Sequence, residues 1–245
     1  MNRVILSAST DETILAVTRQ HKLVDLEIEQ QINTEIVGCI YKGVVKNIVP
    51  AVDGIFVDIG IGKNAFLRRK DLLNEKRFPT EGSPILAQVI KSDTDMKGAL
   101  ITEKISMFGK YAVTLSGTGY IGVSKKIRQE SVRKRLKEIG KEICAEHMGL
   151  IIRTAAENAD MDEFRKDITR LKENWDIIQK RFRMEKSPTL LYRESDIIVK
   201  ALRDYVNKGT EILITDNRKI YERICKLNES EHTIEPVSYT HLRAH

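Results

Sequence analysis

Hydrophobic and polar residues alternate over several short stretches in the first part of the chain, and glycine, proline or a polar turn separates these stretches. The alternation predicts strands over residues 3–7, 13–19 and 23–28, with a turn at residues 9–12 between the first two. Three such strands are too short to be stable alone. We therefore expect this opening meander to complete a sheet that a later part of the chain supplies.

A second group of strands is predicted between residues 38 and 90. β-Forming side chains in near alternation are broken by Pro50, by Asp53-Gly54 and by two further glycines, which is typical of short strands joined by tight turns. The stretch 85–90 adds another strand. The pattern indicates a small, strongly bent barrel.

Two phenylalanines occupy unusual positions in this pattern. Phe56 has the same parity as Asp58 and the opposite parity to Val57, so it is expected on the polar face, and Phe66 recurs at an equivalent position on the next strand. Exposed aromatic rings on such a barrel stack unpaired bases, each worth about 1–3 kcal/mol. The alternative is that both rings belong to the barrel core, and periodicity alone leaves both interpretations open.

The next segment combines a turn with a basic helix. Strands are expected over 111–115 and 120–123, with residues 116–119 as the hairpin turn between them. Val132, Leu136 and Ile139 then have the spacing of a helix with one buried stripe, which leaves the basic residues outside. These are Lys125, Lys126, Arg128, Arg133, Lys134, Arg135, Lys137 and Lys141. Such a face is ordinarily only solvated, but the excess of one sign also suits a track for phosphates.

An apolar strand over residues 149–152 ends in Arg153-Thr154. A guanidinium fork beside a hydroxyl and adjacent backbone N–H groups can bind an anion, although an arginine at a strand end is more often part of an edge salt bridge.

A long amphipathic helix follows, with its cap at residues 160–163 and an apolar seam from Met161 to Phe182 that includes Trp175 as a core residue.

The last part of the chain alternates strand and helix. Residues 189–192 and 211–215 are predicted strands, residues 195–206 a helix capped by Ser195, and a further helix begins at Asp216, which together indicate a parallel βαβ unit. Asp196, Asp204 and Asp216 suggest a metal site, but aspartates at helix starts are better explained as caps.

Composition narrows the class of protein. The 245 residues are 41% hydrophobic and 31% charged, which is typical of a globular chain. A net charge of +6 suits a polyanionic partner and is equally compatible with solubility alone. The three cysteines form no Cys-x-x-Cys pair, the apolar runs are too short for a bilayer, and the first residues do not resemble a signal peptide. We expect a cytoplasmic, reducing location.

Three motifs resemble one bacterial family. Residues 43–45, 56–60 and 65–67 resemble the OB-fold RNA-binding domain of the ribosomal-protein type found in ribonucleases E and G, and residues 149–155 resemble the 5′-sensor signature of the same enzymes. Residues 194–196, 203–205 and 211–214 resemble their ribonuclease-H-like subdomain, whose role is structural. The resemblance covers nearly all of residues 3–227.

The resemblance assigns roles to particular residues. It implies that Phe56 and Phe66 grip single-stranded RNA and that Lys97 contributes to the same face. It implies that Arg153 and Thr154 hold the 5′-monophosphate of the RNA. Lys125 stands where the family has an arginine, so it retains the charge but loses the bidentate fork.

The predicted fold is mixed α+β, with an OB-fold barrel and a 5′-sensor subdomain inserted into a ribonuclease-H-like α/β subdomain. The expected parts are residues 1–34 and 188–227 for the ribonuclease-H-like subdomain, 35–103 for the barrel, and 104–187 for the 5′-sensor subdomain. Residues 228–245 are expected to be a non-native tail, because residues 237–245 show neither periodicity nor the family pattern.

The function implied is recognition of single-stranded RNA with a 5′-monophosphate, within an endoribonuclease of RNA processing and decay. The resemblance places the catalytic aspartates and their Mg²⁺ beyond this chain, so no residue here is assigned to catalysis or to a metal, and the chain alone is expected to be inactive. It also implies a homo-oligomer for the intact enzyme and a monomer for this chain. The alternatives are a non-catalytic OB-fold RNA-binding module of translation and a protein-interaction scaffold that uses the seam of residues 161–182.

Overall fold

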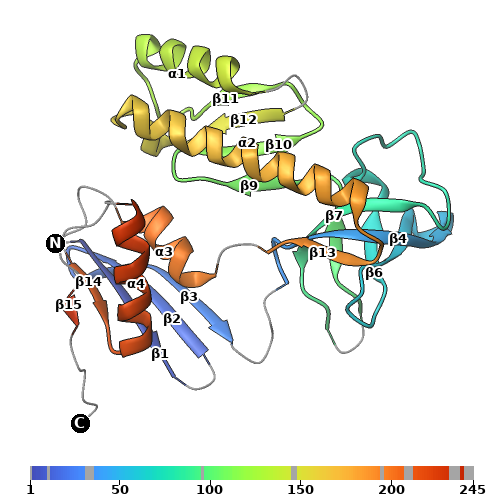
Figure 1. Cartoon of the computed structure of the whole chain (residues 1–245), viewed down its shortest axis with the longest axis horizontal. Helices are drawn as coiled ribbons and strands as arrows, with labels where there is room; N and C mark the ends of the chain where they lie inside the picture. The colour runs from blue at the N-terminus through green and yellow to red at the C-terminus, as the bar shows by residue number, and fades with distance from the viewer. Residues whose placement is uncertain are drawn as a thin grey trace. The chain divides into compact units, whose positions relative to one another are not determined.

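The chain folds into two compact units (Figure 1). One unit consists of residues 1–35 with 195–245, and the other of residues 36–194. The computed structural model describes residues 2–9, 12–30, 36–94, 97–144, 148–193, 196–206, 212–231 and 238–239. Among these residues, no helix is both long enough and apolar enough to cross a membrane.

The first unit is a sheet covered on one face by two helices. Its strands follow the order β15-β14-β1-β2-β3, with β1 (Asn2–Ala8), β2 (Glu12–Arg19), β3 (Lys22–Gln30), β14 (Ile212–Thr215) and β15 (Ser238–Tyr239). The meander is antiparallel, and β1 also pairs in parallel with β14, so the opening strands do complete a sheet with a later part of the chain. The helices are α3 (Ile197–Tyr205) and α4 (Arg218–Glu231), and both pack on the core of Val4, Leu6, Leu15 and Leu213.

The helix caps in this unit differ from the predicted ones. Asp196 rather than Ser195 caps α3, because its carboxylate accepts the N–H groups of residues 198 and 199; Ser195 itself lies outside the described residues. Asn217 caps α4 by accepting from two N–H groups, whereas Asp216 accepts from the Ser7 hydroxyl at 2.5 Å. Asp204 pairs with Arg203 at 3.0 Å. The three aspartates therefore each have a structural partner within their own unit.

The second unit contains a closed five-stranded barrel. Its strands are β4 (Ile40–Val49), β5 (Gly54–Asp58), β6 (Ala65–Arg68), β8 (Leu100–Thr102) and β7 (Pro84–Lys91), and the pairing of β4 with β7 closes the barrel. Two 3-10 turns, Pro50–Val52 and Arg69–Asp71, lie between strands. Inward-facing Ile55, Val57, Ala65 and Leu67 are fully buried in its core. The expected small, bent barrel is confirmed.

Strand β13 (Thr189–Tyr192) extends the sheet of this barrel as a sixth strand and does not belong to the other unit. It pairs antiparallel with β4, with Leu190 opposite Tyr41, and the Arg181 guanidinium donates to the carbonyls of Leu190 and Leu191. The predicted parallel βαβ unit over residues 189–215 is therefore wrong. The structure changes unit at residue 195, so the expected boundary before residue 188 falls too early.

A four-stranded sheet and two helices make up the rest of this unit. The sheet order is β11-β12-β10-β9, with β9 (Ser106–Phe108), β10 (Ala112–Ser116), β11 (Ile121–Val123) and β12 (Met148–Ile152). Helices α1 (Glu130–Ile143) and α2 (Met161–Met184) pack on it, and a 3-10 turn, Thr154–Ala156, follows β12. Asp160 caps α2 and Trp175 packs against the core, as expected.

The hairpin predicted at residues 116–119 is wrong. Strand β12 lies between β10 and β11, antiparallel to the first and parallel to the second. Gly149 of β12 is closely packed against Thr118, and a β-carbon at residue 149 would clash there. Because β12 pairs in parallel with β11, the carboxyl ends of these two strands meet at one edge of the sheet.

Candidate nucleic-acid interface

The two phenylalanines form a pair on the outer surface of the barrel. Phe56 of β5 lies directly opposite Phe66 of β6, and the ring centroids are 5.4 Å apart at an interplanar angle of 52°. Both rings are partly exposed, whereas their chain neighbours face the core. The prediction that they stand on the polar face is confirmed.

Gly54 makes this arrangement possible. A β-carbon at residue 54 would clash with the Phe66 ring, so only glycine leaves room for that ring to lie across β5. The paired rings therefore form a preorganised aromatic surface, and stacking on unpaired bases is the interaction that such a surface can make.

Lys97 lies in an exposed turn next to this surface. Its backbone N–H donates to the Thr94 carbonyl at 3.2 Å, and the adjacent Gly98 packs so closely on the Asn64 carbonyl that a side chain would not fit. The carbonyl of Ala99, the residue after Gly98, accepts the N–H of Phe66 at 2.7 Å. The turn that carries Lys97 is thus anchored beside the strand that carries Phe66.

A second cluster lies where β11 and β12 end; we call its four residues, Ser124, Lys125, Arg153 and Thr154, the Ser124–Thr154 site. Val123 is paired with Ile152, so the next residues of both strands emerge side by side. The Ser124 and Thr154 hydroxyls are 3.0 Å apart, and the Ser124 N–H donates to the Ile152 carbonyl at 2.8 Å. Lys125 follows in an exposed loop. Two hydroxyls and a cation at one sheet edge can bind an oxyanion.

The Arg153 side chain has a defined anchor. Its Nη1 donates to the Gly109 carbonyl at 2.9 Å, and its backbone N–H donates to Tyr111 at 2.8 Å. The half-buried guanidinium is therefore held over the turn between β9 and β10 rather than extended into solvent.

That turn is held in place by Asp167 of α2. The buried carboxylate accepts the N–H of Lys110 at 3.2 Å and that of Tyr111 at 2.8 Å, and Arg170 pairs with it at 3.2 Å. A β-carbon at Gly109 would clash with the same carboxylate. Asp167 therefore orders the turn whose Gly109 carbonyl accepts from Arg153.

Tyr111 adds a second link between the turn and α2. Its hydroxyl donates to Glu163 at 2.5 Å, and its ring packs edge-on against Phe164 with centroids 6.4 Å apart. Burial raises the pKa of this phenol, and the hydrogen bond to the Glu163 carboxylate raises it further. The phenol is thus neutral throughout the ordinary pH range.

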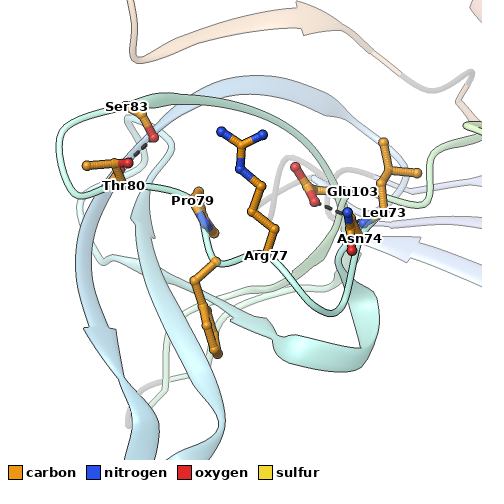
Figure 2. A pocket seen from close by; sticks show the side chains of 8 residues that line it. Leu73, Asn74, Arg77, Pro79, Thr80, Ser83 and Glu103 are labelled. Atoms are coloured by element: carbon orange, nitrogen blue, oxygen red, sulfur yellow. Dashed lines mark hydrogen bonds between the residues drawn. The ribbon is translucent and has the colours of Figure 1, made fainter.

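A pocket of about 350 Å³ opens elsewhere on the barrel (Figure 2). Figure 2 shows the Arg77 side chain extending between the turn at Thr80 and Ser83 and the carboxylate of Glu103. Glu103 accepts the Leu73 N–H at 3.0 Å, and burial raises the pKa of its carboxyl group. None of the residues predicted to bind RNA lines this pocket.

Metal ligands are not gathered anywhere in the part of the chain that the structure describes, since no group of three or more His, Cys, Asp or Glu residues could hold an ion there.

Comparison with known proteins places the chain in a family. The model of the "Ribonuclease E/G family" matches residues 106–242, and that of the "S1 RNA binding domain" matches residues 35–102. The chain belongs to the ribonuclease E/G family. The barrel with the paired phenylalanines is its S1 RNA-binding domain.

Relatives within the ribonuclease E/G family support this assignment. Ribonuclease G of Escherichia coli K12 is 32% identical over 96% of this chain and 51% of its own length. Ribonuclease G of Haemophilus influenzae is 31% identical over 90% of this chain and 48% of its own length. Ribonuclease E of Buchnera aphidicola (Schizaphis graminum) is 31% identical over 91% of this chain and 25% of its own length. The chain thus spans about half the length of the ribonuclease G relatives, and less of ribonuclease E.

The ribonuclease E/G match also corrects an expectation about the end of the chain. The family match reaches residue 242, whereas residues 237–245 were expected to show no family pattern. The structure pairs Ser238 and Tyr239 in parallel with β14, and α4 continues to Glu231. Local periodicity did not reveal this strand because it has only two residues.

Sequence reasoning missed several residues that organise these sites. Ser124 and Gly109 carry little local signal, because their roles depend on strands that pair across the sheet. Asp167 did carry one: it is a carboxylate between Phe164 and Leu171 in an otherwise apolar seam, where a charge needs a buried partner.

Proposed function

We propose that this chain is the RNA-recognition part of an endoribonuclease that cleaves single-stranded RNA during RNA processing and decay. In this proposal, Phe56 and Phe66 stack unpaired bases, and Lys97 neutralises a nearby phosphate. The Ser124–Thr154 site binds the 5′-monophosphate of the same RNA. The observation that carries the proposal is the junction of the β11 and β12 carboxyl ends, which brings Ser124 and Thr154 within 3.0 Å of each other beside Lys125.

The chemistry of the site supports a terminal phosphate as its ligand. The two hydroxyls can each donate to a phosphate oxygen, and the Lys125 ammonium contributes charge without fixed geometry. Arg153 supplies the remaining positive charge from a guanidinium already oriented by the Gly109 carbonyl. We infer that a monophosphate binds more tightly than a triphosphate, which is bulkier.

The proposal assigns the other parts of the enzyme as follows. The unit of residues 1–35 and 195–245 is a ribonuclease-H-like subdomain with a structural role, and the barrel and the 5′-sensing sheet are inserted into it. The catalytic aspartates and Mg²⁺ belong to the portion of the family that this chain does not match, and the chain alone is inactive. The intact enzyme is a cytoplasmic homo-oligomer.

The test is a binding comparison with two RNAs of one unstructured sequence, ending in a 5′-monophosphate or a 5′-hydroxyl and carrying a 3′-fluorophore. Charge-assisted hydrogen bonds contribute about 1.5–3 kcal/mol, so we expect the parent chain to prefer the monophosphate by about 10-fold or more. Thr154→Val and Arg153→Ala should lose this preference. Thr169→Val, an exposed threonine of α2, is the matched control and should keep it.

The barrel is tested in the same assay. Phe56→Leu should weaken the binding of both RNAs equally, by about 1–3 kcal/mol, because base stacking does not depend on the 5′ group. A parent chain that binds both RNAs alike would refute 5′-phosphate recognition, and a Phe56 variant with full affinity would refute the stacking role.

A further inference from the structure

The positive charge of the chain is concentrated in one segment. Residues 125–141 contain eight Lys and Arg residues and two Glu residues, a net charge of +6, which equals the net charge of the whole chain. The remaining residues are therefore neutral in sum. By comparison, the 24 residues of α2 contain seven basic and five acidic side chains.

Helix α1 presents part of this charge as an ordered stripe. Its buried residues, Leu136, Ile139 and Gly140, face the sheet, and a β-carbon at Gly140 would lie only 3.2 Å from Ile121 and Leu150. Lys134, Lys137 and Lys141 recur at steps of three and four residues and are all exposed, so they share one side of the helix.

The basic side chains of α2 and those of residues 125–141 differ in their ion pairing. In α2, Arg165 binds both carboxylate oxygens of Glu142 at 3.0 Å, and Arg181 pairs with Glu185 at 2.5 Å. The cations of residues 125–141, Arg133 apart, form no ion pair with any residue that the structure describes. They are Lys125, Lys126, Arg128, Lys134, Arg135, Lys137 and Lys141, and all are exposed. Like charges so close together repel one another, which favours an anionic partner over an empty surface.

The stripe is joined to the Ser124–Thr154 site through Arg133. The half-buried Arg133 guanidinium donates to the carbonyls of Ser124 at 2.7 Å and Ile127 at 2.9 Å, which fixes the start of α1 to the loop that leaves the site. Lys125, Lys126 and Arg128 occupy this loop. The 14-residue helix is about 21 Å long, enough to pass several phosphates of a nucleic-acid backbone.

We propose that α1 and the preceding loop bind the sugar–phosphate backbone of RNA next to the 5′-phosphate site, through Lys134, Lys137 and Lys141 as the principal contacts. This inference rests on the proposed function, in which RNA is the ligand. The contact is electrostatic and independent of sequence, because ammonium groups on a helix surface meet phosphates and not base edges. It extends recognition from the terminal phosphate to the body of the RNA.

The salt dependence of binding tests this directly. We compare the 245-residue chain with the triple variant Lys134→Gln/Lys137→Gln/Lys141→Gln, which removes three charges and keeps good helix-forming residues. The control is Lys166→Gln/Lys180→Gln/Lys186→Gln, three exposed lysines with the same change of charge. Affinity for a 5′-monophosphorylated single-stranded RNA of about twenty nucleotides is measured between about 50 and 200 mM salt, a range over which such contacts weaken strongly.

We expect the salt dependence of RNA affinity to weaken in the α1 variant and to change little in the control. Each phosphate contact to single-stranded RNA contributes about −0.7 to the slope of log affinity against log salt, so the α1 variant should lose about 2 units of slope and the control little. Its preference for the 5′-monophosphate over the 5′-hydroxyl should stay at the parent value, because the Ser124–Thr154 site is intact.

Each other outcome is informative. Equal slopes for the parent and the α1 variant, or equal losses in both triple variants, would overturn the role of α1 even if the 5′-monophosphate preference is present. A loss of slope without any 5′-monophosphate preference in the parent would retain α1 as an RNA contact and refute the proposed 5′ site. Binding of a polyglutamate probe as tightly as RNA, and lost in the α1 variant, would replace RNA by an acidic protein and overturn the inference.

Discussion

Removing the Asp167 carboxylate should affect both stability and 5′-phosphate recognition. Asp167 is only 6% exposed and accepts backbone N–H groups from Lys110 and Tyr111. In Asp167→Ala both donors lose their partner, and the hydrogen bond to Tyr111 is fully buried. A buried donor without an acceptor costs about 1–3 kcal/mol, and the partly buried Lys110 N–H costs less, so we expect a total loss of about 2–4 kcal/mol.

The same change should reach the Ser124–Thr154 site through the turn at Gly109. With the carboxylate gone, the Gly109 carbonyl is no longer held where it accepts from Arg153. We therefore expect the preference for a 5′-monophosphate to fall, whereas Asp167→Asn, which keeps one acceptor oxygen, should retain more of both properties.

The assay is urea unfolding followed by Trp175 fluorescence, together with the two-RNA binding comparison. Trp175 is the only tryptophan of the chain, lies in α2 and packs against the core beneath that helix. Its fluorescence therefore reports on the folding of this part of the molecule. Asp176→Ala, an exposed carboxylate on the same helix, is the control. If Asp167→Ala changed the free energy of unfolding by less than about 0.5 kcal/mol, as ordinary surface substitutions do, the carboxylate would not hold the turn.

Three further outcomes are expected. Gly54→Ala should displace the Phe66 ring and weaken single-stranded RNA binding by about 1–3 kcal/mol in the two-RNA binding comparison, although no aromatic residue is removed; unchanged affinity would mean that the ring pair is not the binding surface. Asp160→Ala removes the α2 cap and should lower the free energy of urea unfolding by about 1 kcal/mol, and a change near zero would show that other contacts hold the helix start. Burial raises the pKa of Glu103 above its ordinary 4.5, so the folded state binds more protons than the unfolded state and stability should fall as pH rises from 4.5 through the folded pKa; Glu103→Gln should remove that slope, and identical pH profiles for both proteins would contradict the shift.

Local patterns predicted much of the fold and part of the candidate site. The parity of Phe56 depends only on alternation along one strand, and the α2 seam on helical spacing, so both could be read from the sequence. The partner of each strand could not. Strand β12 separates β10 from β11, and β13 pairs with β4. Pairing between distant segments is decided by how their side chains pack together, which no local window contains.

The positioning residues show the same limit. Arg153 and Thr154 were visible as a motif, but Gly109 and Asp167 act on them through a turn formed by a different part of the chain. Helix caps were predicted one residue away from Asp196 and Asn217, since several adjacent polar residues can cap and only the backbone path selects one.

Photo-crosslinking can show whether one RNA contacts both the paired phenylalanines and the Ser124–Thr154 site. A single-stranded RNA carries 4-thiouridine either as its first nucleotide or at an internal position, with a 5′-monophosphate or a 5′-hydroxyl, and the crosslinked peptides are identified by mass spectrometry. We expect the first nucleotide of the monophosphate RNA to crosslink to peptides containing residues 124–128 or 153–156, the 5′-hydroxyl RNA to lose these crosslinks, and internal labels to crosslink to β5 and β6. The same crosslinks from both RNAs, or none near residues 124 and 154, would contradict this expectation.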